Sequence, residues 1–288
     1  MGFSVTGQNF PMDTVALSRK SRADKSRLAA PSLKIAGFGA CMITGYPHEG
    51  GGFFETACGL VETRLSRPVQ STVVSLGGFP APRAQKYLRK KLFDFNPQYV
   101  VIQLGATDAQ CPIRAGSRPN DCGSRLGENS SISISSAAGT TSYHAQPATA
   151  LSPIRWQVAS LIGSLRRIEP ITPLPCYAAA IERMVEDCRS AGIRPVVLSP
   201  FVYGSRYTMR KAIAYVTALR ELASKTQDMI LVDCVRLLAE FQKTRILQHD
   251  GFHLSRFGQN IVGEAVGNAI IEDVIGSNFE DMRPQKFG

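Results

Sequence analysis

Five short apolar runs constrain the fold of this chain more than any other feature of its 288 residues. Each run is about the length of one strand, is rich in β-branched residues and has few polar positions. The runs are residues 33–39, 71–77, 99–105, 194–200 and 229–234. Strands of this composition are expected where both faces of a sheet are covered, because neither set of alternate side chains meets water.

Segments with a helical spacing of apolar residues lie between and after these runs. They cover residues 81–93, 177–191, 210–225 and 256–275. In the second of them, Ile181, Met184 and Cys188 fall on one side of a helix. The alternation of strand and helix predicts a parallel sheet with right-handed crossovers, built as one α/β domain.

Two regions do not fit this alternation. Residues 1–30 are polar and basic without steady periodicity, which predicts a flexible tail. Residues 109–153 are dense in Ser, Gly and Thr and are far longer than an ordinary loop, so we expect either a mobile lid or a disordered insertion. The predicted organisation is therefore a basic tail, 1–30, and one domain, 31–288, that carries the 109–153 insertion.

The composition limits the classes of partner. The formal net charge is +10, but the basic clusters are short and no nucleic-acid-binding motif accompanies them, so we expect a solvated basic face and no nucleic-acid partner. No run approaches the ~18 apolar residues of a membrane span.

The cysteines point to a cellular compartment. There are seven, an odd number, and they form no Cys-x-x-Cys pair or Cys/His ligand spacing. This pattern favours a reduced, cytoplasmic protein with no metal site, and no motif indicates a cofactor.

Residues that could carry chemistry follow the predicted strands. They are Cys41 after the first, Gly77 and Gly78 after the second, Thr107 and Asp108 after the third, and Asp250 and His253 before the last helix. The carboxyl ends of parallel strands meet at the edge of the sheet where ligands bind. Taken singly, each has a structural explanation as well: Cys41 as a small core residue, Asp108 as a helix cap, and His253 as a surface loop residue.

Taken together and in this order, these residues resemble the SGNH (GDSL-type) hydrolase family, from about residue 33 to 275. The family carries a Gly-Asp-Ser block after its first strand, and "GAC", ending at Cys41, stands there. Its Gly-x-Asn-Asp block corresponds to "GATD", which contains Thr107 and Asp108. Its Asp-x-x-His block is matched in full by Asp250 and His253.

The resemblance implies a fold and a site. The fold is a flavodoxin-like three-layer sandwich with a five-stranded parallel sheet and helices on both faces. The implied site residues are the catalytic triad Cys41, His253 and Asp250, the oxyanion-hole donors Cys41, Gly78 and Thr107, and the substrate-binding residues Asp108 and Gly77. The implied substrate is a small-molecule or carbohydrate ester, or a thioester, with hydrolysis or acyl transfer as the reaction.

Two substitutions leave two functions open. Cys41 replaces the family's nucleophilic serine, and Thr107 replaces its oxyanion-hole asparagine. A thiol beside an imidazole is a credible nucleophile, whereas a threonine hydroxyl is shorter than an asparagine amide. The resemblance therefore leaves two expectations, an esterase or acyltransferase, or a catalytically inactive SGNH-like module that binds carbohydrate or protein. The intact Asp250 and His253 favour the enzyme, because a binding module has no need for a base and the acid that orients it.

Overall fold

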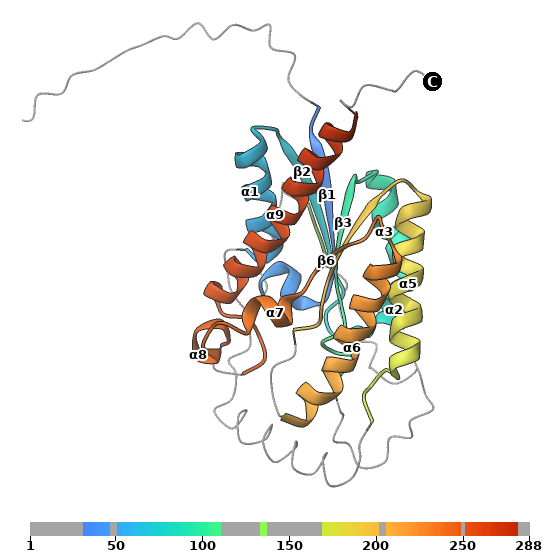
Figure 1. Cartoon of the computed structure of the whole chain (residues 1–288), viewed down its shortest axis with the longest axis vertical. Coiled ribbons are helices and arrows are strands. Elements are labelled where there is room, and N and C mark those ends of the chain that lie inside the picture. The colour runs from blue at the N-terminus through green and yellow to red at the C-terminus, as the bar shows by residue number, and fades with distance from the viewer. Residues whose placement is uncertain are drawn as a thin grey trace, which may run out of the picture. The chain divides into compact units, whose positions relative to one another are not determined.

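Six strands form one sheet in the order β4-β2-β1-β3-β5-β6. Figure 1 shows the sheet together with the helices that pack on it. The computed structural model describes residues 31–46, 51–110, 133–136, 169–201, 206–248 and 251–281, which lie within the unit Pro31–Gly288. The strands are β1 (Leu33–Gly39), β2 (Val69–Ser75), β3 (Tyr99–Gln103), β4 (Ser133–Ser136), β5 (Arg194–Leu198) and β6 (Ile230–Val232).

Five of these strands, β2, β1, β3, β5 and β6, are parallel, and they correspond to the five runs in the sequence. The chain leaves β1 toward β2 on one side of the sheet and then returns to β3 on the other. The strand order therefore reverses between β1 and β3, which is the place where α/β sheets of this kind bind ligands. The predicted fold class, an α/β fold with a five-stranded parallel sheet and helices, is confirmed.

The sixth strand, β4, was not predicted. It lies inside the predicted 109–153 insertion and pairs antiparallel with β2, with Ile134 opposite Val74. Its sequence, Ser-Ile-Ser-Ser, has too few apolar residues to be recognised as a strand. Most of the insertion and the whole of the predicted tail, 1–30, lie outside the described residues, so their predicted flexibility stays a prediction.

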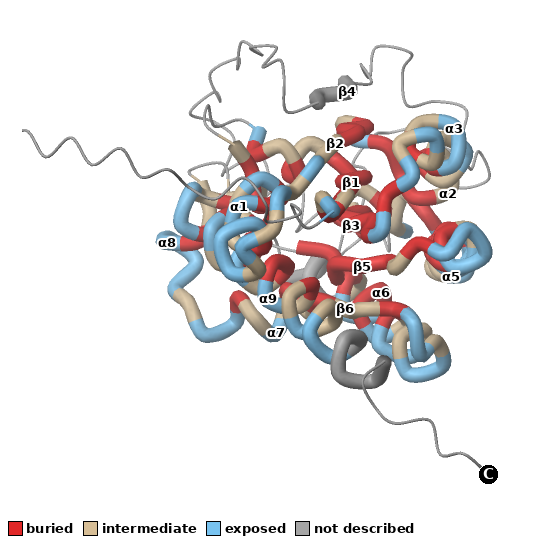
Figure 2. The backbone as a smooth tube through the Cα atoms, turned by 90° about the horizontal axis from the view of Figure 1, so that it is seen from above, coloured by how far each residue is buried: buried red, intermediate tan, exposed pale blue. Residues whose placement is uncertain are grey.

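Helices cover both faces of the sheet. One layer holds α2 (Ala81–Ala84), α3 (Leu88–Leu92), α5 (Leu174–Ser190) and α6 (Arg206–Lys225), and the other holds α1 (Phe53–Leu65), α7 (Cys234–Leu238), α8 (Lys243–Ile246) and α9 (Arg256–Asp281). Buried strands run between the two layers (Figure 2). None of the described helices combines the length and the hydropathy that crossing a bilayer requires.

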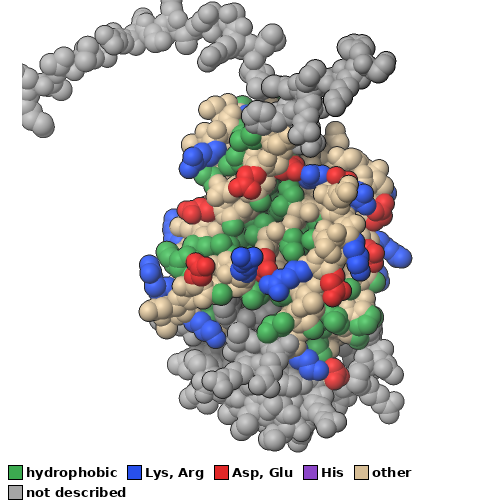
Figure 3. Space-filling model, in the orientation of Figure 1, with side chains coloured by type: hydrophobic (Ala, Val, Ile, Leu, Met, Phe, Trp, Pro, Cys, Tyr) green, Lys and Arg blue, Asp and Glu red, His purple; other side chains and the backbone are tan. Residues whose placement is uncertain are grey.

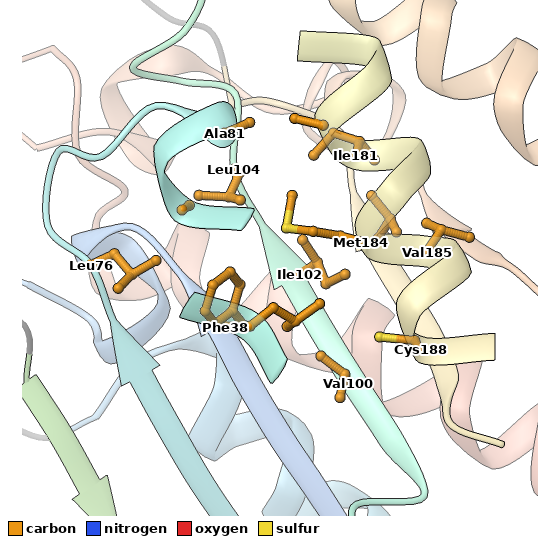
Figure 4. Close-up of a cluster of buried hydrophobic side chains, with 14 of the residues drawn as sticks. Phe38, Leu76, Ala81, Val100, Ile102, Leu104, Ile181, Met184, Val185 and Cys188 are labelled. Carbon is orange, nitrogen blue, oxygen red and sulfur yellow. The ribbon is translucent and has the colours of Figure 1, made fainter. Parts of the chain in front are cut away.

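Successive side chains of a strand point to opposite faces of the sheet, so each strand contributes to two separate hydrophobic cores. In β1, Phe38 faces the layer of α2 and α5, whereas Ile35 faces the layer of α1 and α9. In the first core, Met184 and Ile181 of α5 point from the helix toward the sheet (Figure 4). The buried positions on both faces explain why the strands have so few polar residues.

The helix boundaries differ in places from the sequence pattern. Residues 81–93 form no single helix: α2 and α3 are joined by a 3₁₀ turn, η2 (Gln85–Tyr87), and a second one, η3 (Phe93–Phe95), follows α3. α1 was not predicted, because three glycines, 50–52, precede its thirteen residues and Gly59 lies within them, so the segment resembles a loop. It is the helix that follows Cys41, so its position bears on the site.

Candidate active site

Cys41 stands at the carboxyl end of the central strand β1. It is the first residue of a 3₁₀ turn, η1 (Cys41–Thr44), and is partly exposed. The Thr44 hydroxyl donates to the Cys41 carbonyl oxygen at 3.0 Å, and Gly45 ends the turn in the left-handed region at φ 83°. The backbone N–H groups at the start of a helical turn have no carbonyl partner within that turn. Because Cys41 is the first residue of η1, its thiol lies close to such N–H groups.

His253 lies beside Cys41, although the two residues are far apart in the sequence. The distance from the Cys41 Sγ atom to the His253 Nε2 atom is 3.6 Å, within hydrogen-bonding range for sulfur. The structure therefore brings together a thiol and the imidazole that could accept its proton.

The backbone around His253 is held by the segment before it. The His253 carbonyl accepts from the Gln248 N–H at 2.9 Å, and the Gln248 side chain donates to the Leu254 carbonyl at 3.0 Å. Leu247 and Leu254 form an antiparallel bridge. Asp250, the predicted third member of the triad, lies outside the described residues, so its role stays a prediction.

Two aromatic rings flank the imidazole. The ring centre of Tyr46 lies 5.5 Å from that of His253 at 69°, and the ring centre of Phe252 lies 5.1 Å away at 87°. Both are edge-to-face arrangements, which aromatic pairs prefer. The surroundings of the Cys41–His253 pair are thus partly apolar, a feature that the sequence pattern did not indicate.

A buried glutamine supports the residue before the thiol. The Ala40 N–H donates to both the carbonyl oxygen and the side-chain Oε1 of Gln103, at 3.1 and 3.2 Å. A side chain at Gly39 would lie 2.6 Å from the Gln103 carbonyl, so only glycine fits there. Gln103 was missed by the motif comparison, although an amide within an apolar run is itself a signal, since buried polar groups need partners.

The loop after β2 begins beside the Cys41 turn. The Leu76 N–H donates to the Gly39 carbonyl at 2.7 Å, so the loop that carries Gly77 and Gly78 starts next to the end of β1. Gly77 has φ 56°, a conformation that favours glycine, and the space around the Cα atoms of both glycines is open. Gly78 is exposed, which leaves its backbone accessible at this edge of the sheet.

The loop after β3 contains Thr107 and Asp108. Thr107 is half-buried, and Asp108 is fully buried. The Asp108 Oδ1 atom accepts from the Ala81 N–H at 2.9 Å. Burial raises the pKa of the Asp108 carboxyl to about 6, against the opposing effect of hydrogen bonds from the Thr172 side chain and from backbone N–H groups. This carboxyl thus ties the loop after β3 to the end of the loop after β2. It has no exposed surface of its own.

The structure therefore brings some of the predicted site residues together and not others. Cys41 and His253 are in contact, and the loops with Gly77, Gly78 and Thr107 leave the strands on either side of β1 at the same edge of the sheet. Asp108 lies behind this edge. Among the described residues, no group of three or more His, Cys, Asp or Glu side chains is placed to hold a metal ion.

Comparison with known proteins identifies the fold. No protein-family model matches this chain, and no curated protein sequence is significantly similar to it. Solved structures do match. The lipase/acylhydrolase from Enterococcus faecalis has 17% sequence identity and a TM-score of 0.54, and the match covers 88% of this chain and 99% of that chain.

Two further solved structures agree with the first. A lipolytic protein described as belonging to the G-D-S-L family, from Desulfitobacterium hafniense, matches at 14% identity with a TM-score of 0.50 and covers 83% of this chain and 99% of that one. A mutant of an acetyl-xylooligosaccharide esterase from Geobacillus matches at 15% identity and a TM-score of 0.53, over 83% and 94% of the two chains. At such identities the likeness shows the fold, which is the one found in SGNH (GDSL-type) lipases and esterases.

Proposed function

We propose that this protein is an SGNH-type hydrolase or acyltransferase that acts on ester or thioester bonds through Cys41, His253 and Asp250. The observation that carries the proposal is the 3.6 Å distance between the Cys41 Sγ atom and the His253 Nε2 atom at the carboxyl end of β1. A thiol and an imidazole in contact at the ligand-binding edge of such a sheet form the nucleophile and base of covalent acyl transfer.

In the first half of the reaction, the His253 Nε2 atom accepts the proton of the Cys41 thiol, and the sulfur attacks the carbonyl carbon of the substrate. The carbonyl π electrons move to oxygen and form a tetrahedral oxyanion. When the oxyanion collapses, the bond to the leaving alcohol or thiol breaks, and the imidazolium returns the proton to that leaving group. The acyl group is then held as a thioester on Cys41.

In the second half, an acceptor attacks the thioester while His253 takes its proton, and the same proton returns to the Cys41 sulfur. Water as the acceptor gives hydrolysis, and an alcohol or amine gives acyl transfer. We assign Asp250 the role of accepting the hydrogen bond from the other imidazole nitrogen, which fixes the tautomer and stabilises the imidazolium.

The oxyanion needs hydrogen-bond donors at the start of η1 and in the two flanking loops. We propose the backbone N–H groups of Cys41 and Gly78 and the Thr107 hydroxyl for this role, with Gly77 shaping the loop. These residues follow β1, β2 and β3, which are neighbours in the sheet, and this placement supports the assignment. Asp108 contributes by tying the Thr107 loop to Ala81, at the end of the Gly78 loop.

The substrates we propose are small-molecule or carbohydrate esters. Solved structures with this fold include a lipase/acylhydrolase and an acetyl-xylooligosaccharide esterase, and the aromatic rings of Tyr46 and Phe252 give the Cys41–His253 pair a partly apolar surround. A reducing cytoplasm, the compartment we propose from the cysteine pattern, would keep Cys41 as a thiol.

Hydrolysis of p-nitrophenyl acetate and butyrate by the wild type, Cys41→Ala and Cys41→Ser tests this function. We expect the Ala variant to lose the ester hydrolysis of the wild type and the Ser variant to retain part of it. Equal background rates in all three proteins would instead favour the inactive binding module.

Labelling with iodoacetamide at neutral pH gives a test that does not depend on the substrate. The chain supplies its own controls: Cys176 is an exposed thiol, while Cys58 and Cys188 are buried, and burial raises the pKa of both to about 12. We expect Cys41 to react faster than Cys176, because a neighbouring imidazole favours the thiolate, and the buried thiols to remain unlabelled. Peptide mass spectrometry measures each rate separately.

A further inference from the structure

The helices that follow the two reacting residues pack directly against each other. α1 follows the turn that begins at Cys41, α9 begins three residues after His253, and the two lie side by side (Figure 1). A Cβ atom at Gly263 of α9 would lie 2.7 Å from the Phe53 carbonyl, and one at Gly267 would lie 3.1 Å from the Ala57 carbonyl. The two backbones are therefore close enough that their relative position has little freedom.

A buried side chain of α9 makes the polar contact between these helices. Gln259 is 2% exposed, and its Oε1 atom accepts from the N–H of Phe53, the first residue of α1, at 3.0 Å. The residue before α1 is Gly52, which has no side chain to cap the helix. Gln259 thus supplies, from the neighbouring helix, an acceptor for one of the N–H groups at the start of α1 that have no partner within the helix.

The first turn of α1 in turn contacts the turn that begins at Cys41. A Cβ atom at Gly52 would lie 2.4 Å from the Gly45 backbone nitrogen and 2.6 Å from the Ile43 carbonyl, so these backbone segments touch. Gly45 is the residue that ends η1. A movement of the start of α1 would therefore be transmitted to the turn of the nucleophile.

Gln259 is also joined rigidly to the segment of His253. Its backbone N–H donates to the Ser255 carbonyl at 2.8 Å, and the Ser255 hydroxyl accepts from the Gly258 N–H at 3.1 Å. The Ser255 N–H in turn donates to the Ile246 carbonyl at 2.8 Å. These hydrogen bonds cap the first turn of α9, so the backbone between His253 and Gln259 has little conformational freedom.

We propose that Gln259 is a positioning residue that sets the distance between the Cys41 sulfur and the His253 imidazole. Its side chain fixes the start of α1, and with it the Cys41 turn, to the first turn of α9. That turn of α9 directly follows the segment of His253, so the same contact also limits where the imidazole lies. The proposal rests on the proposed function, in which these two side chains exchange a proton. Because misplacement by about 1 Å can cost ~10²-fold in rate, a single hydrogen bond at this junction can affect the chemistry.

The test compares Gln259→Met, Gln259→Glu and a matched control. Methionine keeps the length of the side chain and removes the acceptor, whereas glutamate keeps an acceptor for the Phe53 N–H. Val266→Ala is the control, since Val266 is a fully buried apolar residue of the same helix that takes no part in this hydrogen bond, and its truncation lowers stability by a packing defect alone. Melting temperature and near-UV circular dichroism verify that each variant is folded.

The readouts are the rate of iodoacetamide labelling of Cys41 relative to Cys176 across pH 5 to 9, and kcat and KM for p-nitrophenyl acetate. For Gln259→Met we expect the relative labelling at pH 7 to fall at least about fivefold, the labelling midpoint to move to higher pH, and kcat to fall about tenfold or more with KM little changed. Gln259→Glu should retain most of both rates. Val266→Ala should lower the melting temperature while leaving the labelling profile as in the wild type.

The outcomes separate the positioning role from the proposed function. If Gln259→Met behaves as Val266→Ala does, with a wild-type labelling profile and kcat, the positioning role is wrong even though Cys41 is reactive. If wild-type Cys41 reacts no faster than Cys176 and Cys41→Ala keeps the ester hydrolysis, the proposed function is wrong, and the positioning role is wrong with it.

Discussion

At the scale of single residues, the thiols of this chain differ through their surroundings. Cys58, Cys188 and Cys234 are buried, and burial raises the pKa of each thiol, so these side chains serve as small apolar residues. Cys41 is partly exposed and 3.6 Å from an imidazole nitrogen. Partial exposure and the contact with His253 distinguish Cys41 from the three buried thiols, and they are the reason we propose it as the nucleophile.

The replacement of the family's asparagine by Thr107 gives a prediction at this scale. If the Thr107 hydroxyl donates to the oxyanion, Thr107→Ala should lower kcat about 10- to 100-fold with little change in KM, since the donor is used only in the transition state. Thr107→Ser keeps the hydroxyl and should stay within a few-fold of the wild type. Steady-state kinetics on p-nitrophenyl acetate measure both, and equal kcat values for the Ala variant and the wild type would exclude Thr107 from the oxyanion hole.

Sequence motifs indicated the two candidate reacting residues but not the glutamines that support the backbone around them. Cys41 and His253 were indicated by their order and spacing, because their chemistry restricts the residue type. Gln103 and Gln259 were not, because a glutamine can support a backbone N–H from any place where the fold brings it within reach. Such contacts depend on three-dimensional packing, which a single sequence does not encode in a short motif.

At the scale of the elements, the strands were more predictable than the helices. Strands β1, β3 and β5 are apolar on both faces, and their composition alone indicates them. The buried residues of α1, Phe53, Phe54, Ala57, Cys58 and Val61, do share one face of the helix. The three glycines at 50–52 and Gly59 within the helix hid this pattern, because glycine favours loops and weakens a helix.

The close contact of α1 and α9 gives a prediction with an internal control. Gly263→Ala should destabilise the protein by about 1–3 kcal/mol, because the new Cβ atom would lie 2.6 Å from the Thr56 Cβ atom. Gly59→Ala, in an exposed position of α1 with open space around it, should stabilise the protein by up to about 1 kcal/mol through its higher helix propensity. Urea denaturation measures both free energies of unfolding, and a neutral Gly263→Ala variant would contradict close packing at this position.

At the scale of the whole molecule, the sheet brings distant segments to one edge. Cys41 follows the central strand β1, and the loops with Gly78 and Thr107 follow β2 and β3, its neighbours on either side. This arrangement follows from the parallel sheet, which the alternation of strand and helix predicted. The sequence pattern could not give the 3.6 Å contact with His253, because that distance depends on how the segment before α9 packs.

The charges of the molecule are mixed on its surface. On the face in Figure 3, Lys and Arg side chains lie among Asp and Glu side chains. Arg194, for example, contacts both Asp228 and Asp273 at 2.6 Å. On this face the basic side chains are therefore interspersed with acidic ones, as expected of a solvated surface.

The buried Asp108 carboxyl gives a prediction for global stability. Its pKa is about 6 in the folded protein against an ordinary value of 3.8, so the folded state holds a proton that the unfolded state releases between these values. Its contribution to stability is therefore full below pH 3.8 and is lost as the pH rises through 6. The difference corresponds to about 3 kcal/mol at most.

Asp108→Asn tests this linkage, since asparagine keeps an oxygen acceptor for the Ala81 N–H and carries no titratable group. The melting temperature of the variant minus that of the wild type should increase between pH 4 and pH 7.5. Subtraction of the wild-type profile removes the contribution of other carboxyl groups, including Glu55, whose pKa burial also raises. Parallel profiles of the two proteins would contradict a shifted Asp108.

The short antiparallel strand β4 has a consequence for association between chains. It pairs with Thr72–Ser75 of β2, whose backbone groups would otherwise offer a template for pairing with another molecule. In the described part of the chain, the two outer strands of the sheet are then β4, with four residues, and β6, with three. Both outer strands are short, so the fold gives a second chain little backbone on which to add a strand and start an aggregate.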